Sequence, residues 1–397
     1  MSQFKTIDDL DVAGMRVLVR LDLNVPMADG KITDTTRIDR SVRTLTELSN
    51  RGALVIVISH FGRPKGQVVP ELSLAPVAKA LSQASGHPVG FASDTVGARA
   101  RMFISEMGEG EIVMLENLRF NRGEEENDRA FTLELSKLGD LYVNDAFSCS
   151  HRAHSSIEGL AHLLPSAAGR LMQAELESLS KALENPEKPV AAVVGGAKVS
   201  TKMEVLGNLA SKVQMLIIGG GMANTLLYAQ GYDVGNSLCE KDMADEARGI
   251  LERAEQAGCQ VVLPMDGVVA REFKAGADSD VVSLDAIPVD SMMLDIGPAS
   301  IADVSARLET CKTLVWNGPF GAFEIPPFDK GTNAVAQAAA NLTTAGKLIS
   351  VAGGGDTVAA LAHAGVSDDF TYISTAGGAF LEWMEGKKLP GVEVLRK

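Results

Sequence analysis

The chain has 397 residues, of which 46% are hydrophobic and 22% charged, so it can form two or three compact domains and is not intrinsically disordered. Lysine and arginine number 37 and aspartate and glutamate 51, and the net charge of −14 would repel a polyphosphate backbone, which argues against a nucleic-acid partner. The 39 glycines follow no Gly-X-Y period, which excludes a collagen-like structure.

In the first half, short β-branched runs alternate with amphipathic segments, and this alternation predicts a parallel sheet covered by helices. A first helix is expected where apolar residues recur at helical spacing from Ile38 to Leu48, with Gly52 placed for a C-terminal cap. A second helix is expected between Ser73 and Gly86. The predicted strands are residues 16–23, 53–59, 88–92, 111–116 and 141–144.

A Leu- and Glu-rich helix is predicted from Arg170 to Glu184, where the two prolines of NPEKP stop it. The same α/β pattern then begins again, so this helix is the natural bridge between two halves of one architecture. The acidic run Glu124–Glu126 is expected to be a solvated loop. The predicted strands of the second half are 190–194, 214–218, 260–264, 292–296, 313–316, 348–352 and 371–374.

The N-terminal segment MSQFKTIDDLD contains no apolar stretch, and the longest apolar run near it is only residues 53–59. This pattern predicts neither export nor membrane insertion, so we expect a cytoplasmic protein. The four cysteines form no Cys-x-x-Cys pair and are expected to be reduced core residues without a zinc site.

Arginines mark the strand ends of the first half, and ligands bind beyond the carboxyl ends of the strands in open α/β sheets. A guanidinium group can hold phosphate or carboxylate through two hydrogen bonds. A single arginine commonly forms a surface ion pair, but four at one sheet edge predict a site for a small molecule with both groups. Asp22, Asn24 and His60 could bind its hydroxyls, and the histidines lack metal-binding spacing. The four arginines are Arg37, Arg63, Arg119 and Arg152.

Glycine-rich turns mark the strand ends of the second half. Glycines before a helix let backbone N–H groups approach an anion, although one such turn alone also fits a tight strand–helix connection. Neither a Walker A motif nor a GxGxxG motif is present. Together with Lys198, Lys202, Glu324 and Asp356, the turns predict a magnesium–nucleotide site. The turns are GGAKVSTK (195–202), GGGMAN (219–224), NGPFGAFE (317–324), AGGGDTVAAL (352–361) and STAGGAFLEW (374–383).

Nine motifs, in this order, make the chain resemble the phosphoglycerate kinases over essentially its whole length. They are RLDLNVP (20–26), SHFGRP (59–64), LENLRF (115–120), HRAH (151–154), GGAKV (195–199), GGGMA (219–223), VWNGPFGAFE (315–324), GGGDT (353–357) and STAGGA (374–379).

The resemblance implies an α/β fold of two Rossmann-like lobes, each a mostly parallel sheet flanked by helices, joined by a hinge helix. Residues 1–169 would bind 3-phosphoglycerate or 1,3-bisphosphoglycerate, and residues 170–186 would form the hinge. Residues 187–378 would bind the magnesium nucleotide, and residues 379–397 would return to the first lobe. The implied activity is reversible phosphoryl transfer from 1,3-bisphosphoglycerate to MgADP, giving 3-phosphoglycerate and ATP in glycolysis and gluconeogenesis. We expect a monomer that closes about its hinge and has neither a nucleic-acid nor a membrane partner.

Site residues carry over motif by motif. The glycerate site would comprise Asp22, Leu23, Asn24, Arg37, His60, Phe61, Gly62, Arg63, Arg119 and Arg152. The nucleotide site would comprise Lys202, Gly219, Gly220, Gly221, Asn317, Glu324, Gly354, Gly355, Asp356 and Thr357, with Glu324 at the ribose and Asp356 on Mg²⁺. The transferring phosphoryl group would be bound by Arg37, Lys198 and Lys202 and by N–H groups near Gly354, Gly355, Gly377 and Gly378.

The chemistry needs no general base, because the nucleophile in the ATP-consuming direction is a carboxylate already ionised at pH 7. Two stretches depart from the family pattern, Ser148–Ser150 and Ala376. We expect Ala376 at negative φ, since positive φ strains a non-glycine residue.

Two rival classes fit the sequence less well. A dinucleotide-dependent dehydrogenase should show a GxGxxG motif, and a periplasmic-type binding protein should show an export signal; the sequence shows neither.

Overall fold

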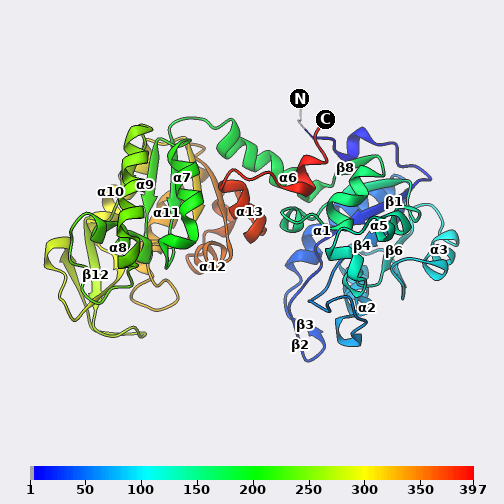
Figure 1. Cartoon of the computed structure of the whole chain (residues 1–397), viewed down its shortest axis with the longest axis horizontal. Helices are drawn as coiled ribbons and strands as arrows, with labels where there is room; N and C mark the ends of the chain where they lie inside the picture. The colour runs from blue at the N-terminus through cyan, green and yellow to red at the C-terminus, as the bar shows by residue number, and fades with distance from the viewer. Residues whose placement is uncertain (1–3) are drawn as a thin grey trace. The chain divides into compact units, whose positions relative to one another are not determined.

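The computed structural model describes residues 4–397 and divides the chain into two compact units. The first unit takes the chain up to Leu176 together with Lys388–Lys397, and the second is Glu177–Lys387. Each unit contains a six-stranded parallel sheet flanked by helices (Figure 1). The predicted α/β class with two such lobes is confirmed.

The first sheet has the strand order β5-β6-β4-β1-β7-β8. Helices α1 (Thr36–Asn50) and α2 (Ala75–Ser85) pack on the face that carries Val17 and Val55. Helices α3 (Ala98–Ser105) and α5 (Arg129–Ser136) pack on the opposite face. Apolar residues on both faces explain why β4 and β6 are wholly apolar and why β1 is apolar from Val17 to Val19. The strands are β1 (Arg16–Arg20), β4 (Leu54–Ile58), β5 (Val89–Ala92), β6 (Ile112–Leu115), β7 (Leu141–Asn144) and β8 (Ser166–Ala168).

The five strands predicted in this half are present, although the first ends at Arg20 and not at Leu23. The two predicted helices are confirmed as α1 and α2. Gly86 ends α2 with φ of 69°, the left-handed conformation that favours glycine. Strand β8 was not predicted, because its three small residues carry no strand signal. The smaller elements are β2 (Met27–Ala28), β3 (Lys31–Ile32), α4 (Arg122–Glu125) and α14 (Pro390–Glu393).

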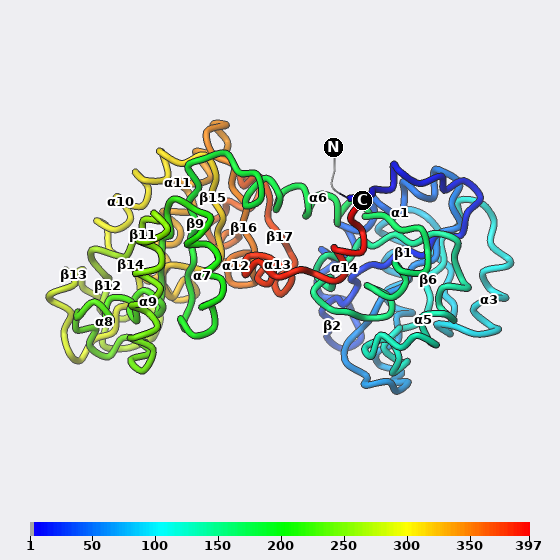
Figure 2. The backbone as a smooth tube through the Cα atoms, turned by 45° about the horizontal axis from the view of Figure 1, so that its top comes forward, coloured from blue at the N-terminus to red at the C-terminus, as the bar shows by residue number. Residues whose placement is uncertain are grey.

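The second sheet has the strand order β11-β10-β9-β15-β16-β17. Helices α10 (Pro298–Glu309), α11 (Lys330–Thr344) and α12 (Gly355–His363) cover one face. Figure 2 shows α7 and α9 as neighbours, and α9 also packs against β11. The strands are β9 (Val190–Val194), β10 (Met215–Ile218), β11 (Gln260–Val262), β15 (Thr313–Asn317), β16 (Ile349–Gly353) and β17 (Tyr372–Ser374). The other helices are α7 (Met203–Ala210), α8 (Gly220–Ala229), α9 (Ala244–Gln256) and α13 (Gly377–Met384).

The predicted strand at Met292–Ile296 exists as β14, but it belongs to a separate antiparallel sheet with β12 (Asp266–Ala270) and β13 (Ser279–Ser283). Placing it in the parallel series was wrong. Periodicity alone could not separate the two sheets, because β13 is mostly exposed and β12 begins with Asp-Gly.

The segment between the units is helical, as predicted. Helix α6 (Arg170–Leu179) continues into a π-helical turn at Ser180–Glu184. The division of the chain at Leu176 falls inside this helix.

The C-terminal segment packs on the first unit from Lys388 onward. The Gly391 N–H donates to the Ser150 carbonyl over 2.9 Å, and a Cβ on Gly391 would lie 3.0 Å from Ser150 Cα. Residues 379–387 pack within the second unit instead, where Lys387 pairs with Glu204.

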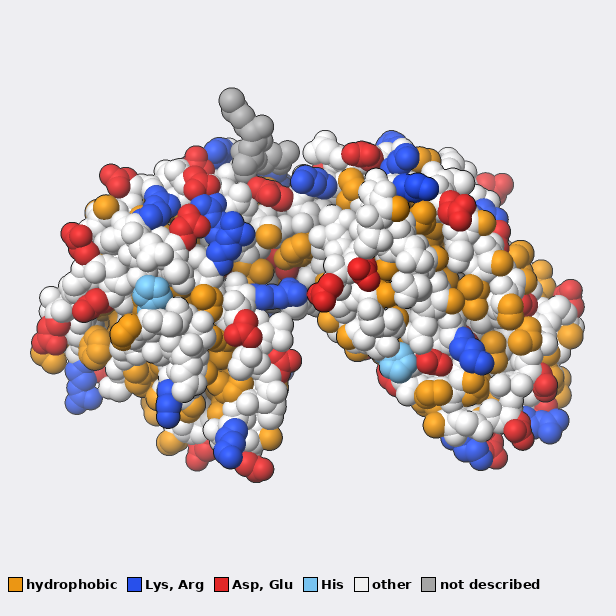
Figure 3. All heavy atoms as spheres, turned by 180° about the vertical axis from the view of Figure 1, so that it is seen from behind, with side chains coloured by type: hydrophobic (Ala, Val, Ile, Leu, Met, Phe, Trp, Pro, Cys, Tyr) orange, Lys and Arg blue, Asp and Glu red, His pale blue; other side chains and the backbone are white. Residues whose placement is uncertain are grey.

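The surface carries charges of both signs. On the face drawn in Figure 3, acidic and basic side chains are interspersed on both units. Among residues 4–397, no helix has the length and apolar character needed to cross a membrane.

Candidate active site

The predicted arginines follow the strand ends of the first sheet. Arg63 comes after β4, Arg119 lies in the turn after β6, and Arg152 comes after β7. Arg37 is the second residue of α1. Arg119 is buried, whereas Arg63 is exposed. This is the sheet edge at which open α/β folds bind ligands.

Arg37 is oriented by the loop after β1. Its Nη1 atom donates to Asp22 Oδ2 over 2.7 Å and to the Asn24 carbonyl over 3.1 Å. Ser148 donates its hydroxyl to the same Asp22 oxygen over 2.5 Å. Ser148, which departs from the expected pattern, therefore helps to fix the carboxylate that holds Arg37.

Backbone hydrogen bonds connect the other predicted residues. The Gly62 N–H donates to Asn24 Oδ1 over 2.9 Å, and Arg119 Nη1 donates to the Gly62 carbonyl over 2.8 Å. Gly62 has φ of 59°, a conformation that favours glycine. Leu23 and Phe61 are buried in the core of the unit, so their side chains serve packing.

His60 is surrounded by positive charge. Its pKa lies well below the usual value, first because the ring is buried and then because Arg20, Arg119, Arg152 and Arg37 act on it. Three of the predicted arginines thus act on one buried imidazole, together with Arg20, which was not predicted. Such a field attracts an anion.

Possible metal ligands also meet here: atoms of Asp22, His60 and Cys149 lie within 4.8 Å of one another. Asp22 is already bound to Arg37 and Ser148, and burial raises the pKa of the Cys149 thiol. With the guanidinium groups around His60, this cluster suits an anion better than a divalent cation.

The four cysteines, all within the described range, form no disulfide.

The prediction of a solvated loop at Glu124–Glu126 is wrong for Glu124. This side chain is fully buried, and its carboxylate accepts hydrogen bonds from the Ser156 N–H at 3.0 Å and hydroxyl at 2.6 Å. A run of three acidic residues is typical of a solvent-exposed segment, and the neighbouring sequence does not indicate which of the three has buried hydrogen-bond partners.

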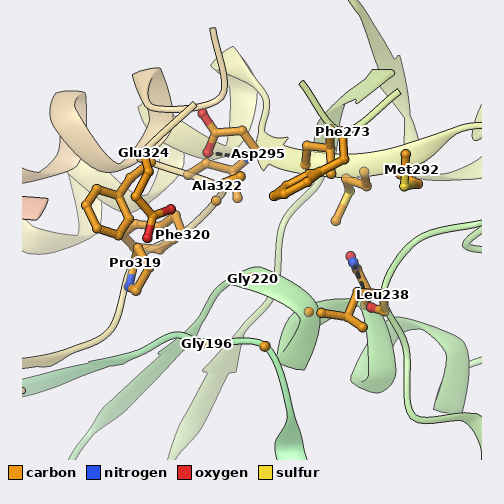
Figure 4. Close-up of a pocket in the computed structure, with 18 of the residues that line it drawn as sticks. Gly196, Gly220, Leu238, Phe273, Met292, Asp295, Pro319, Phe320, Ala322 and Glu324 are labelled. Carbon is orange, nitrogen blue, oxygen red and sulfur yellow. Dashed lines mark hydrogen bonds between the residues drawn. The ribbon is translucent and has the colours of Figure 1, made fainter. Parts of the chain in front are cut away.

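The second unit contains a pocket of about 390 Å³. Phe320 and Glu324 lie on one side of it, and Leu238, Phe273 and Met292 lie across from them (Figure 4). Four of the predicted nucleotide residues line it: Gly220, Gly221, Glu324 and Asp356. An apolar pocket with a few polar groups is typical of a small-ligand site.

The apolar wall of the pocket was not predicted. Leu238 and Phe273 are 53% and 58% exposed, which is unusual for residues of their size. Both lie in loops, where no periodicity distinguishes them from other apolar residues. Only their exposure in the fold reveals them.

The Lys202 side chain contacts two of the glycine-rich turns. Its Nζ atom donates to the Gly195 carbonyl over 2.7 Å and to Asn317 Oδ1 over 2.6 Å. Burial lowers the pKa of Lys202 to about 8, although Asp356 acts to raise it. Because little negative charge offsets the positive charge of this buried lysine, the site favours binding of an anion. Lys198, by contrast, is exposed.

The glycines of GGGMA have a packing role. The Gly219 and Gly220 N–H groups already donate to the carbonyls of Val194 and Phe320, so they are not available to a phosphate. A Cβ on Gly220 would lie 2.7 Å from the Gly196 carbonyl oxygen. These glycines therefore allow a tight strand–helix connection, which is the alternative explanation for such a turn.

The N-terminus of α12 is a better anion-binding element. Gly354 caps it with φ of 99°, and Gly355, Asp356 and Thr357 form the first turn, whose N–H groups have no acceptor within the helix. Thr357 accepts a hydrogen bond from the Gly318 N–H over 2.7 Å. Gly377 and Gly378 are the first two residues of α13, whose first N–H groups likewise have no acceptor within the helix.

Comparisons with known proteins agree with this arrangement. The profile of the phosphoglycerate kinase family matches residues 7–387. Phosphoglycerate kinases of Rhizobium meliloti (strain 1021) and Agrobacterium fabrum are 62% and 61% identical, over 99% and 100% of this chain and 99% of each relative. The fold is similar to phosphoglycerate kinase from Coxiella burnetii, with a TM-score of 0.93, 43% identity, and coverage of 99% of this chain and 98% of that one. With this agreement over nearly its whole length, the chain is a phosphotransferase that belongs to the phosphoglycerate kinase family.

Proposed function

We propose that the first unit binds 3-phosphoglycerate or 1,3-bisphosphoglycerate and the second unit binds ADP or ATP. The observation that carries this proposal is the division of chemistry between the units. One has arginines at its strand ends around a neutral histidine, and the other has an apolar pocket beside Lys202 and the start of α12. The reaction is reversible transfer of a phosphoryl group between the acyl phosphate and ADP.

In the first unit, the exposed Arg63 and the oriented Arg37 would hold the phosphate and carboxylate of the three-carbon acid. Asp22 can accept a hydrogen bond from the ligand hydroxyl, since a carboxylate is an acceptor only. Substrate selection then depends on two anionic groups separated by a short polar backbone. An apolar carboxylic acid lacks the second anionic group and the polar backbone.

In the second unit, the flat base would lie against Leu238 and Phe273, with the ribose near Glu324. The α12 N-terminus and Lys202 would hold the phosphates. Asp356 fits a Mg²⁺ ligand, because it is exposed, lies in the first turn of α12 and borders the pocket. When bound there, the ion would neutralise phosphate charge.

The roles proposed for the transfer are positional and electrostatic. Arg37, Lys198 and Lys202 would hold oxygens of the transferring group, and N–H groups at Gly354, Gly355, Gly377 and Gly378 would bind its remaining charge. The ionised carboxylate attacks without a general base.

We further propose that transfer requires closure of the units, because each ligand binds to a different one. Closure would also keep water from the acyl phosphate. Solution scattering should give a smaller radius of gyration with both 3-phosphoglycerate and a nucleotide than with either alone. Equal compaction by one ligand would contradict this requirement.

From the proposed kinase activity we also propose the compartment, the pathway and the oligomeric state of the enzyme. We expect the enzyme in the cytoplasm, acting in glycolysis and gluconeogenesis as a monomer. Sedimentation at micromolar concentration should give the mass of one 41.9 kDa chain, and a dimer mass would contradict the monomer.

A coupled assay tests the activity itself. The enzyme is mixed with 3-phosphoglycerate and MgATP, and the 1,3-bisphosphoglycerate formed is reduced by a triose-phosphate dehydrogenase with NADH. We expect NADH oxidation that requires both substrates. The control replaces 3-phosphoglycerate with 2-phosphoglycerate, and equal rates with both acids would contradict the proposed substrate.

A further inference from the structure

We infer that the buried Glu124 is a positioning residue of the glycerate site, acting on His60 through Ser156 and Arg20. Three hydrogen bonds, through the side chains of Ser156 and Arg20, connect the fully buried carboxylate to the imidazole. The inference rests on the proposed role of His60 in substrate binding. It adds to that role a residue that itself contacts no ligand.

The first link joins Glu124 to Ser156. Glu124 Oε1 accepts from the Ser156 hydroxyl over 2.6 Å, and Oε2 accepts from the Ser156 N–H over 3.0 Å. Neither side chain is exposed. Since an ionised carboxylate can only accept, the single hydroxyl proton of Ser156 points toward Glu124.

The second link joins Ser156 to Arg20. The serine oxygen, whose hydroxyl hydrogen points to Glu124, accepts a hydrogen bond from Arg20 Nε over 2.8 Å. Arg20 is 1% exposed, and a buried guanidinium is costly without a counter-charge. Burial raises the pKa of Glu124, and the charge of Arg20 is the first influence that opposes this rise. Each buried charge therefore stabilises the other.

The third link joins Arg20 to His60. Arg20 Nη2 lies 3.0 Å from His60 Nδ1, while Nη1 donates to the Leu21 carbonyl. A guanidinium has only donors and stays protonated, so Nδ1 must be the acceptor. The imidazole proton is then on Nε2, and the depressed pKa keeps the ring neutral. His60 is thereby fixed as an N–H donor for an anionic ligand.

Other charged groups near Glu124 do not replace Arg20 in this arrangement. His154 Nδ1 is 3.9 Å from Glu124 Oε1, but burial lowers the pKa of His154 to about 4, so it is neutral at pH 7. Arg119 also acts on Glu124, more weakly than Arg20 and the two Ser156 hydrogen bonds. Arg119 has its own hydrogen bond to the Gly62 carbonyl.

The decisive variant is Glu124→Gln, which keeps the shape of the side chain and removes its charge. We expect the KM for 3-phosphoglycerate to rise by about 10- to 100-fold, the range for loss of a hydrogen bond to a charged group, with the KM for nucleotide within about twofold. Glu126→Gln is the matched control, because Glu126 is an exposed partner of Arg122 in the same acidic run. We expect this control to match wild type.

Nitrogen NMR of the histidines supplies a readout that a packing defect alone would not move. The His60 signals are assigned from their absence in His60→Gln. Wild type should show the Nε2–H form from pH 6 to 8, and Glu124→Gln should add the Nδ1–H form. Ser156→Ala breaks the same chain while keeping both charges, so it provides the test should Glu124→Gln not fold, and Ser156→Thr should restore the wild-type spectrum.

Two outcomes separate the inference from the function on which it rests. If folded Glu124→Gln and Ser156→Ala both keep the Nε2–H form and a KM for 3-phosphoglycerate within about twofold of wild type, the positioning role is wrong. If His60→Gln binds 3-phosphoglycerate as tightly as wild type, His60 does not belong to the substrate site. The latter result overturns the proposed site whatever the spectra show.

Discussion

Lys202 Nζ lies 2.6 Å from Asn317 Oδ1 and donates to it. Asn317 ends β15 and donates its own amide to the Gly353 carbonyl over 2.7 Å. The lysine is thus held by neutral groups, so burial lowers its pKa from 10.5 to about 8. Its charge near neutral pH is available to a bound phosphate.

This pKa predicts a pH dependence of ADP binding. As the pH rises from 7 to 9, Lys202 loses its proton and the Kd should rise by up to about tenfold. Isothermal titration at several pH values measures it. The exposed Lys198 gives the control: Lys198→Met should keep the pH dependence, and Lys202→Met should abolish it. The same dependence in Lys202→Met would contradict the assignment.

Rising pH weakens ADP binding through Lys202, but the same residue makes the folded state more stable as the pH rises. Its folded pKa lies below its unfolded value, so the unfolded chain binds more protons between about pH 8 and pH 10.5. This group therefore makes the unfolding free energy increase with pH in that window. Comparing urea midpoints of wild type and Lys202→Met across the window isolates its contribution. A contribution that decreases with pH would show that the pKa is raised instead.

Arg37→Ala should lower kcat by at least about 10²-fold, because it removes the charge-assisted donor that we propose for the transferring group. Asp22 and Asn24 hold this guanidinium, so its loss also leaves Asp22 Oδ2 with only the Ser148 hydroxyl, while Oδ1 keeps the Asn24 N–H. Steady-state kinetics measure the effect, with the exposed Arg43→Ala on the same helix as control. A change confined to KM would assign Arg37 to ground-state binding.

Asp356→Asn should weaken the dependence of ADP binding on Mg²⁺, since it removes the carboxylate in the first turn of α12. Titrating ADP with and without Mg²⁺ measures the difference. Asp368→Asn makes the same charge change at another exposed site in this unit. An unchanged magnesium effect in Asp356→Asn would place the metal ligand elsewhere.

Ala376 has φ of −97°, so the expected negative φ is confirmed and the residue is not strained. Ala376→Gly should leave kcat within about twofold. It should lower stability by about 1 to 2 kcal/mol, because it frees the unfolded chain and removes a buried methyl group. Denaturant unfolding and kinetics on one variant test both parts. A kcat gain above about fivefold would indicate that turnover needs positive φ there.

Much of the architecture could be predicted because parallel strands buried on both faces are continuous apolar runs. Val190–Val194 and Leu141–Asn144 were predicted with the bounds observed. Strand β13 could not be predicted, because its SDVVS sequence is mostly exposed and lacks a buried face. Its pairing depends on β12, which only the folded chain supplies.

Residues of the candidate site could be located where polar side chains follow strands, as Asp22 and Arg119 do. The hydrogen bonding of the Gly219 N–H and the burial of Glu124 could not be predicted. A glycine turn looks the same in sequence whether its N–H groups face a phosphate or a carbonyl, and at Gly219 the acceptor is Val194. Burial of Glu124 depends on Ser156, a distant partner in sequence.

Under the proposed function, acid and nucleotide bind to different units, and calorimetry of two variants can separate the two sites. Arg63→Ala and Lys202→Met are each titrated separately with 3-phosphoglycerate and with MgADP. We predict that Arg63→Ala weakens 3-phosphoglycerate binding by about tenfold or more and leaves MgADP binding within about twofold, with the reverse for Lys202→Met. If either variant weakened both ligands equally while remaining folded, separate sites on the two units would be contradicted.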